Sequence, residues 1–140
     1  MSRIAVVFWS GTGNTESMAS AVAEGALSKG AEAKLFAASE FSADMMDEFD
    51  AVAFGCPAMG AEELEDSEFA PMFDACLPKL RDKKIALFGS YGWGDGEWMR
   101  TWEENCRTAG AFLPADPVIV NEAPDEDGLE ACRGLGAAIA

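Results

Sequence analysis

Short apolar runs alternate along the chain with segments in which apolar residues recur at helical spacing. Continuous apolar runs are typical of strands that are buried on both faces of a parallel sheet. Five such runs predict strands at residues 4–9, 33–36, 51–55, 84–89 and 118–120. Helical spacing predicts helices at residues 15–28, around 69–77, at 97–107 and at 128–139.

The order of these elements predicts the fold class. Strands and helices alternate throughout, without a linker, a repeat or a low-complexity segment, which predicts one doubly wound α/β sheet with right-handed crossovers. A chain of 140 residues can bury one sizeable core, so we expect a single domain over residues 1–140. Ligands of such sheets bind outside the carboxyl ends of the strands. Three glycine-rich segments leave strands at that edge: residues 10–15, 56–63 and 90–96.

The first segment has the composition of a phosphate-binding loop. It contains Ser10, Gly11, Thr12, Gly13, Asn14 and Thr15. Its glycines allow the backbone amides to converge, and the following helix adds the positive end of its dipole. The loop lacks the lysine of a nucleoside-triphosphate loop, and Glu16 occupies the third glycine position of a dinucleotide fingerprint. It also lacks the cysteine and arginine of a phosphatase, so we expect a phosphate that is held and not transferred. A glycine-rich turn with a helix cap is the simpler alternative.

The other two segments each place a large side chain beside a glycine in a loop. These side chains are Met59 and Trp93. Either one alone is more often an anchor packed on its own domain. Together with a phosphate loop at the same edge, the pair predicts two walls around a planar ring, and hence a mononucleotide cofactor.

The net charge and the absence of certain residue types limit the classes of partner and metal site that we expect. The formal net charge is −15, which disfavours nucleic acid and anionic membrane surfaces and favours a basic protein partner. The chain has no histidine and no paired cysteine motif, so we expect no metal site. No apolar run is long enough to span a bilayer, and no signal-peptide pattern is visible. We expect the four cysteines to be reduced, buried small hydrophobes in a cytoplasmic protein.

Three motifs in order carry a family resemblance. They are Trp9-Ser-Gly-Thr-Gly-Asn-Thr15, Gly55-Cys-Pro-Ala-Met-Gly60 and Phe88-Gly-Ser-Tyr-Gly-Trp-Gly-Asp-Gly96. The whole chain resembles the short-chain flavodoxins of the clostridial type. The resemblance implies a three-layer α/β/α sandwich with a five-stranded parallel sheet in the order 2-1-3-4-5. It also implies a monomeric, low-potential one-electron carrier that binds FMN non-covalently, serves redox partner proteins with basic docking surfaces and has no catalytic residue or substrate turnover of its own.

The resemblance also implies roles for individual residues. The loop of residues 10–15 would bind the FMN phosphate, and Met59 and Trp93 would stack on the two faces of the isoalloxazine. Glu62 would accept a hydrogen bond from the flavin N3 edge, and the Gly60–Ala61 peptide would face N5 and O4. The further cofactor-binding residues would be Pro57, Ala58, Ser90, Tyr91, Gly92, Gly94 and, more weakly, Asn121.

Two positions depart from some relatives. Pro57 replaces a serine that reaches the phosphate in those relatives, which implies one phosphate contact fewer. Ala61 lacks the Asp or Ser side chain that others carry at this position.

Two other classes of protein share part of this pattern. An FMN-dependent quinone or azo reductase would use a similar loop, but it needs an open flavin face and a proton donor. A response-regulator-like domain needs an acceptor Asp at the end of the third strand, where Gly55 and Cys56 stand.

Carboxylates gather near the expected flavin edge. Glu62, Glu63, Glu65, Asp66 and Glu68 follow Met59, and Asp95 and Glu97 follow Trp93. One interpretation is that they are solvated acids at helix starts, which complement the helix dipole. The other is that they surround the exposed flavin edge and steer basic partners.

Overall fold

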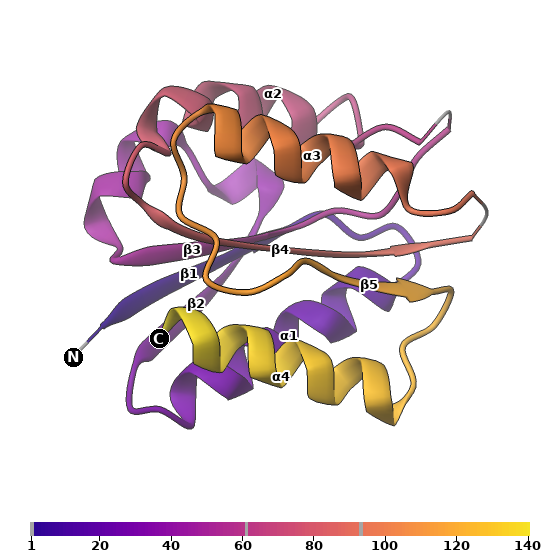
Figure 1. Ribbon diagram of the computed structural model, residues 1–140, viewed down its shortest axis with the longest axis horizontal. Coiled ribbons are helices and arrows are strands. Elements are labelled where there is room, and N and C mark those ends of the chain that lie inside the picture. Colours follow the sequence, from indigo (N-terminus) through magenta and orange to yellow (C-terminus); the bar gives the residue numbers. More distant parts are fainter. Residues whose placement is uncertain (1, 61, 93) are drawn as a thin grey trace.

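A parallel sheet forms the middle layer of the computed structural model, which describes residues 2–60, 62–92 and 94–140 (Figure 1). Its strands are β1 (Arg3–Phe8), β2 (Glu32–Ala37), β3 (Ala51–Gly55), β4 (Lys84–Tyr91) and β5 (Val118–Asn121). The spatial order is β2-β1-β3-β4-β5, and every neighbouring pair is parallel. The predicted doubly wound fold and its strand order are confirmed.

Helices cover both faces of the sheet. They are α1 (Asn14–Leu27), α2 (Phe69–Cys76), α3 (Glu97–Thr108) and α4 (Glu126–Ile139), with short 3-10 helices η1 (Ala38–Glu40), η2 (Ala43–Glu48) and η3 (Leu77–Lys79). Figure 1 shows α2 and α3 on one face and α1 and α4 on the other. The predicted helices begin and end within two residues of these bounds. In the described part of the chain, no helix combines the length and the apolar character needed to cross a membrane.

The segment between β2 and β3 differs from the prediction. Strict alternation predicts a helix there, and this is wrong, because η1 and η2 occupy the segment instead. Phe41 and Phe49 end these two turns in extended conformation. Their rings pack on Phe36, with centroids 5.3 and 5.7 Å away. The irregular spacing of these buried rings suits two short turns better than one α-helical stripe.

The helices α1 and α4 approach each other closely through two glycines. A Cβ on Gly136 would lie 1.9 Å from the carbonyl oxygen of Val22, and one on Gly25 would lie 1.8 Å from that of Arg133. Neither position accepts a side chain while the backbones stay where they are. This contact fixes the layer below the sheet, from which α1 presents its N-terminus to the carboxyl edge.

The order of the strands creates a crevice at that edge. β1 and β3 are neighbours, but the chain leaves β1 toward α1 on one face and leaves β3 toward α2 on the other (Figure 1). Diverging connections of this kind open a cleft outside the carboxyl ends of the two strands. The three segments singled out in the sequence all leave or follow strands at this place.

Candidate functional site

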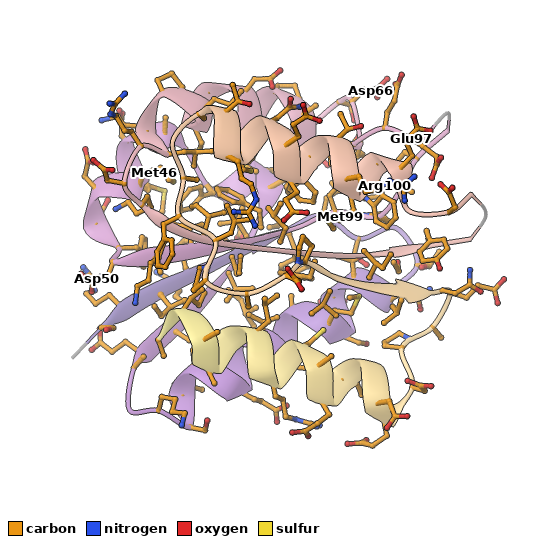
Figure 2. The ribbon with its side chains drawn as sticks, in the orientation of Figure 1. Met46, Asp50, Asp66, Glu97, Met99 and Arg100 are labelled. Atoms are coloured by element: carbon orange, nitrogen blue, oxygen red, sulfur yellow. The ribbon has the colours of Figure 1, made fainter. Side chains whose placement is uncertain are left out.

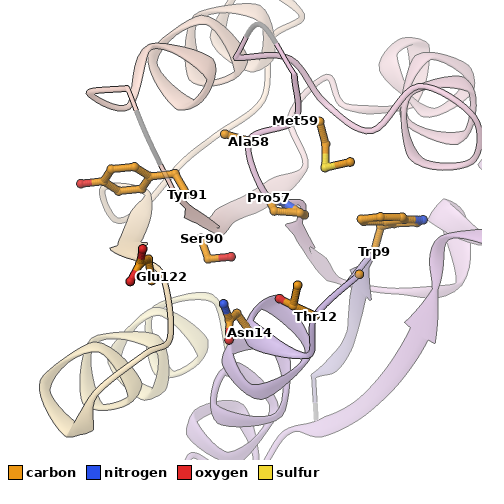
Figure 3. Close-up of a pocket in the computed structure, with 11 residues that line it drawn as sticks. Trp9, Thr12, Asn14, Pro57, Ala58, Met59, Ser90, Tyr91 and Glu122 are labelled. Atoms are coloured by element: carbon orange, nitrogen blue, oxygen red, sulfur yellow. The ribbon is translucent and has the colours of Figure 1, made fainter.

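A pocket of about 450 Å³ lies at the carboxyl edge of the sheet. Its lining comes from three separate segments and the end of β5: Trp9, Gly11, Thr12, Asn14, Pro57, Ala58, Met59, Ser90, Tyr91, Gly92 and Glu122. In Figure 3, Thr12 and Asn14 lie on one side, Met59 lies opposite, and Tyr91 and Trp9 flank the opening. The lining is mostly apolar, with polar groups concentrated where α1 begins. Pockets of this size and character are suited to small cofactors.

The loop of residues 10–15 presents amides and hydroxyls to this pocket. Gly13 has a φ of 96°, and its amide donates to Ser10 Oγ at 3.0 Å, so the loop curls before α1 begins. Among the described residues, no side chain caps the N-terminus of α1. Thr15 is only 1% exposed, and its hydroxyl lies 3.3 Å from that of Ser90. The first amides of α1 and its dipole therefore face the pocket without a competing side-chain acceptor.

The Met59 segment forms a tight hairpin. The amide of Met59 donates to the carbonyl of Glu63 at 2.8 Å, and the amide of Glu63 donates back at 2.9 Å. Gly60 and Glu62 both have positive φ, 48° and 56°, as the reversal requires. The amide of Ala58 donates to the carbonyl of Ser90 at 3.0 Å, which joins this segment to β4. Ala61 lies outside the described residues, and so does its part in the predicted Gly60–Ala61 peptide.

The third segment begins inside the sheet. β4 extends to Tyr91, two residues beyond the prediction, because Ser90 and Tyr91 pair with β5. Ser90, Tyr91 and Gly92 line the pocket as predicted residues of the site. Trp93, the predicted second wall, lies outside the described residues.

Several predicted residues lie behind or beside the pocket, not in its lining. Ser10 and Gly13 form the hydrogen bond that curls the loop of residues 10–15, and the Thr15 hydroxyl lies beside that of Ser90. Gly60 follows Met59 in the hairpin. Asn121 is exposed, and its amide reaches the carbonyl of Tyr91 at 3.5 Å. Cofactor contact by these residues stays a prediction.

The Glu62 carboxylate lies at the start of α3. Its Oε1 accepts the amide of Glu97 at 3.2 Å, and a Cβ on Gly94 would lie 2.5 Å from the same oxygen. Glu62 therefore joins the Met59 hairpin to the loop before α3. The hydrogen bond to a flavin that the resemblance implies for this carboxylate stays a prediction.

Trp9 and Glu122 line the pocket, and the sequence analysis did not select them as site residues. Trp9 directly follows β1, and its indole donates to Glu68 Oε1 at 3.0 Å. Its place at the end of the first strand was a usable signal. Glu122 has a φ of 60° and donates its amide to the carbonyl of Tyr91 at 2.7 Å. Nothing in its residue type points to this conformation.

Glu65 corrects the interpretation of the acidic segment. It is 5% exposed, so it is neither a solvated acid nor part of a steering surface. Its carboxylate accepts the amide of Ser67 at 2.9 Å, those of Glu68 and Phe69 at 2.8 Å, and the Ser67 hydroxyl. Burial raises the pKa of Glu65, but these hydrogen bonds outweigh burial and lower the pKa from 4.5 to about 2. Glu65 is the internal cap of α2.

Comparisons with known proteins identify the family of the chain. The Flavodoxin family model matches residues 6–136. The chain belongs to the flavodoxin family. It is 44% identical over 137 residues to a flavodoxin of Megasphaera elsdenii, covering 98% of both chains. It is 46% identical over 121 residues to one of Clostridium beijerinckii, covering 86% of this chain and 88% of the relative. A solution structure of two-electron reduced Megasphaera elsdenii flavodoxin superimposes with a TM-score of 0.89 at 43% identity, covering 97% of each chain.

Membership of the flavodoxin family defines the activity. The protein is an FMN-binding electron carrier that exchanges electrons with redox partner proteins and turns over no substrate of its own. The resemblance to the short-chain, clostridial-type flavodoxins is confirmed. The quinone or azo reductase alternative is not favoured.

Proposed function

We propose that FMN binds in the pocket at the carboxyl edge, with its phosphate on the loop of residues 10–15 and its ring beside Met59. The observation that carries this proposal is that the uncapped N-terminus of α1 and a mostly apolar pocket open into one another. A flavin mononucleotide has the matching chemistry, since it joins a dianionic phosphate to a flat, largely apolar ring. FMN supplies one-electron chemistry when it is bound.

The phosphate end of the proposed site is electrically neutral. The described residues that line the pocket include no lysine or arginine. We infer that amides at the start of α1 and the hydroxyls of Ser10, Thr12 and Thr15 hold the phosphate by hydrogen bonds. Such donors on a rigid helix start orient an anion as well as attract it. Binding should therefore depend only weakly on salt.

The ring end is bounded by two strand-end loops. Met59 offers a polarisable side chain from the hairpin, and Tyr91, the last residue of β4, lies on another side of the pocket (Figure 3). We expect Met59 and the predicted second wall, Trp93, to exclude water from the ring. We propose that the Gly60–Ala61 peptide and Gly94 contact the edge of the ring that the hairpin faces.

Reconstitution tests the assignment directly. The apoprotein should bind one FMN, quench its fluorescence, and take up two electrons in separate steps during an anaerobic titration followed by absorbance. NMR chemical shifts should change most in residues 10–15, 57–60 and 90–92. One-to-one binding with shift changes confined to another part of the surface would overturn the site and leave the family assignment intact.

We also propose that partner proteins dock on the acidic carboxyl edge of the sheet. We further propose that the chain is a monomer and acts in the cytoplasm. Glu63, Asp66, Asp95 and Glu97 are exposed around the Met59 hairpin and the start of α3. Figure 2 shows Asp66 and Glu97 at the same end of the molecule. Clustered charge of one sign raises the association rate of an oppositely charged partner. Burial also keeps the cysteines from bridging copies, since all four are free and buried.

The docking proposal predicts a charge-specific loss of rate. The double variant Glu63→Gln/Asp66→Asn should slow reduction of a basic c-type cytochrome several-fold at low ionic strength, because surface fields raise on-rates by about 10- to 1000-fold. Stopped-flow absorbance measures the rate. The matched control Glu104→Gln/Asp116→Asn changes the net charge equally at exposed sites outside this cluster. Salt near 1 M should abolish the difference, as the Debye length falls to about 3 Å. If both double variants slowed the reduction equally, only the net charge of the protein would matter, and docking on this acidic edge would be contradicted.

A further inference from the structure

Cys56, the residue that follows β3, holds together several segments behind the pocket. Its side chain is buried and its own backbone does not line the cavity, but Pro57, Ala58 and Met59 follow it directly into the lining. The position of Cys56 therefore decides where the Met59 hairpin begins.

Trp98 holds the carbonyl of this residue. Trp98 lies in the first turn of α3, is 2% exposed, and its indole Nε1 donates to the Cys56 carbonyl at 3.2 Å. A Cβ on Gly89 would lie 2.2 Å from the same carbonyl oxygen and 3.1 Å from the Trp98 ring. Glycine in β4 thus leaves the space in which the carbonyl and the indole meet. The Trp98 ring also packs beside Tyr91, with centroids 5.6 Å apart.

The thiol of Cys56 holds the far end of the same loop. The amide of Glu65 donates to Cys56 Sγ at 3.3 Å. The Glu65 carboxylate in turn caps α2 and accepts the amide of Glu68, whose side chain accepts the indole of Trp9. One residue therefore ties both ends of residues 57–64 to α3, to the start of α2 and, through Glu68, to the end of β1.

Two more hydrogen bonds hold the described part of the hairpin. The Ala58 amide donates to the Ser90 carbonyl, and the Glu62 carboxylate accepts the amide of Glu97. A hairpin whose base is fixed before the cofactor binds places Met59 with little entropic cost.

We propose that Trp98 is a positioning residue, which fixes the base of the Met59 hairpin through the Cys56 carbonyl and thereby sets the affinity for FMN. This inference rests on the proposed FMN site. Trp98 acts from behind the pocket and touches no cofactor. Its indole N–H donates to the buried Cys56 carbonyl, which would lose this hydrogen bond without Trp98.

Trp102 provides a matched control in the same helix. It lies one turn after Trp98 and is also 2% exposed, but its Nε1 has no acceptor among the described residues. Trp98→Phe therefore removes a bonded indole N–H, whereas Trp102→Phe removes an unbonded one with the same loss of ring size. The lost volume should lower the stability of both apoproteins. Trp98→Phe should lower it further, because it also leaves the buried Cys56 carbonyl without its donor.

The experiment compares FMN affinity with stability in both variants. We expect Trp98→Phe to raise the FMN Kd about five- to ten-fold, the effect of one lost hydrogen bond, and to shift at least one of the two midpoint potentials. Trp102→Phe should leave both quantities near those of the parent. Urea unfolding of the apoproteins measures stability separately. It therefore distinguishes a general loss of packing, which lowers stability, from a displaced Met59 hairpin, which lowers FMN affinity. Equal FMN affinities in the two variants would overturn the proposal.

If Trp98→Phe does not fold, a second matched pair tests the premise that the base of the hairpin sets the affinity for FMN, and an unchanged FMN Kd in Cys56→Ala would overturn the proposal. Cys56→Ala removes the acceptor of the Glu65 amide, and Cys76→Ala removes a buried thiol whose Sγ lies 3.9 Å from Met72 Sδ, away from the pocket. Cys56→Ala should weaken FMN binding and Cys76→Ala should not, with Cys56→Ser restoring an acceptor. If the parent itself binds FMN elsewhere, the proposed site fails first, and shift mapping with FMN shows this independently of either pair.

Discussion

Thr15→Ala is expected to weaken FMN binding by about 1–3 kcal/mol, which is roughly five- to 150-fold in Kd. Thr15 is buried, and its hydroxyl lies 3.3 Å from that of Ser90 at the start of the proposed phosphate site. Its removal takes away one proposed phosphate donor and leaves the Ser90 hydroxyl without this neighbour. Fluorescence titration of FMN with the apoprotein measures the effect.

The control for this change lies in the same turn of α1. Ser17 is exposed, and its hydroxyl donates to the carbonyl of Gly13 at 3.1 Å. Ser17→Ala should leave the FMN Kd within about two-fold of the parent, since a surface change of this kind is worth about 0.5 kcal/mol or less. The Thr15→Ala loss should also be the same at low and moderate salt, because the loop holds no cation. A steep salt dependence in the parent would contradict a neutral phosphate site.

Gly136→Ala is expected to destabilise the fold by about 2 kcal/mol or more. The new methyl group would meet the Val22 carbonyl at 1.9 Å, and a backbone atom within α1 cannot step aside as a flexible side chain can. The two helices must separate, which opens the core below the sheet. Thermal or urea unfolding of the apoprotein measures the loss.

Gly134 offers the opposite result in the same helix. A Cβ there meets nothing within 4 Å, and the residue is exposed. Gly134→Ala should therefore raise stability by up to about 1 kcal/mol, since alanine loses less backbone entropy in a helix. If both variants lost stability equally, the close contact between α1 and α4 would not be the cause.

The apolar pattern predicted the sheet because the central strands β1, β3 and β4 are almost wholly buried. It predicted the four α-helices because each helix buries apolar residues at helical spacing. It failed between β2 and β3, where Phe41, Met46 and Phe49 enter the core from turns too short to show a period. Glycine contacts such as Gly25 and Gly136 were also invisible, because they depend on how two distant helices cross.

Within the site, the glycine-rich segments predicted which loops meet, and the structure brings Thr12, Met59 and Ser90 to one pocket. Residue type alone did not predict which carboxylates face water. Glu65 and Asp66 are neighbours in the sequence, yet one is a buried cap and the other is exposed. That difference comes from the path of the backbone before α2. Trp98 was equally hidden, since a tryptophan in an amphipathic helix predicts only a core position.

The four buried cysteines can serve as probes of local opening in the structure. Burial raises the pKa of Cys56, Cys106 and Cys132 to about 12 and that of Cys76 to about 11. Only a thiolate attacks an alkylating reagent, so at neutral pH each thiol reacts only when its surroundings open. We expect the labelling rates of Cys76, Cys106 and Cys132 to report the opening of α2, α3 and α4. Cys56 precedes the Met59 hairpin, so we expect its labelling rate to report separation of the hairpin base from Glu65.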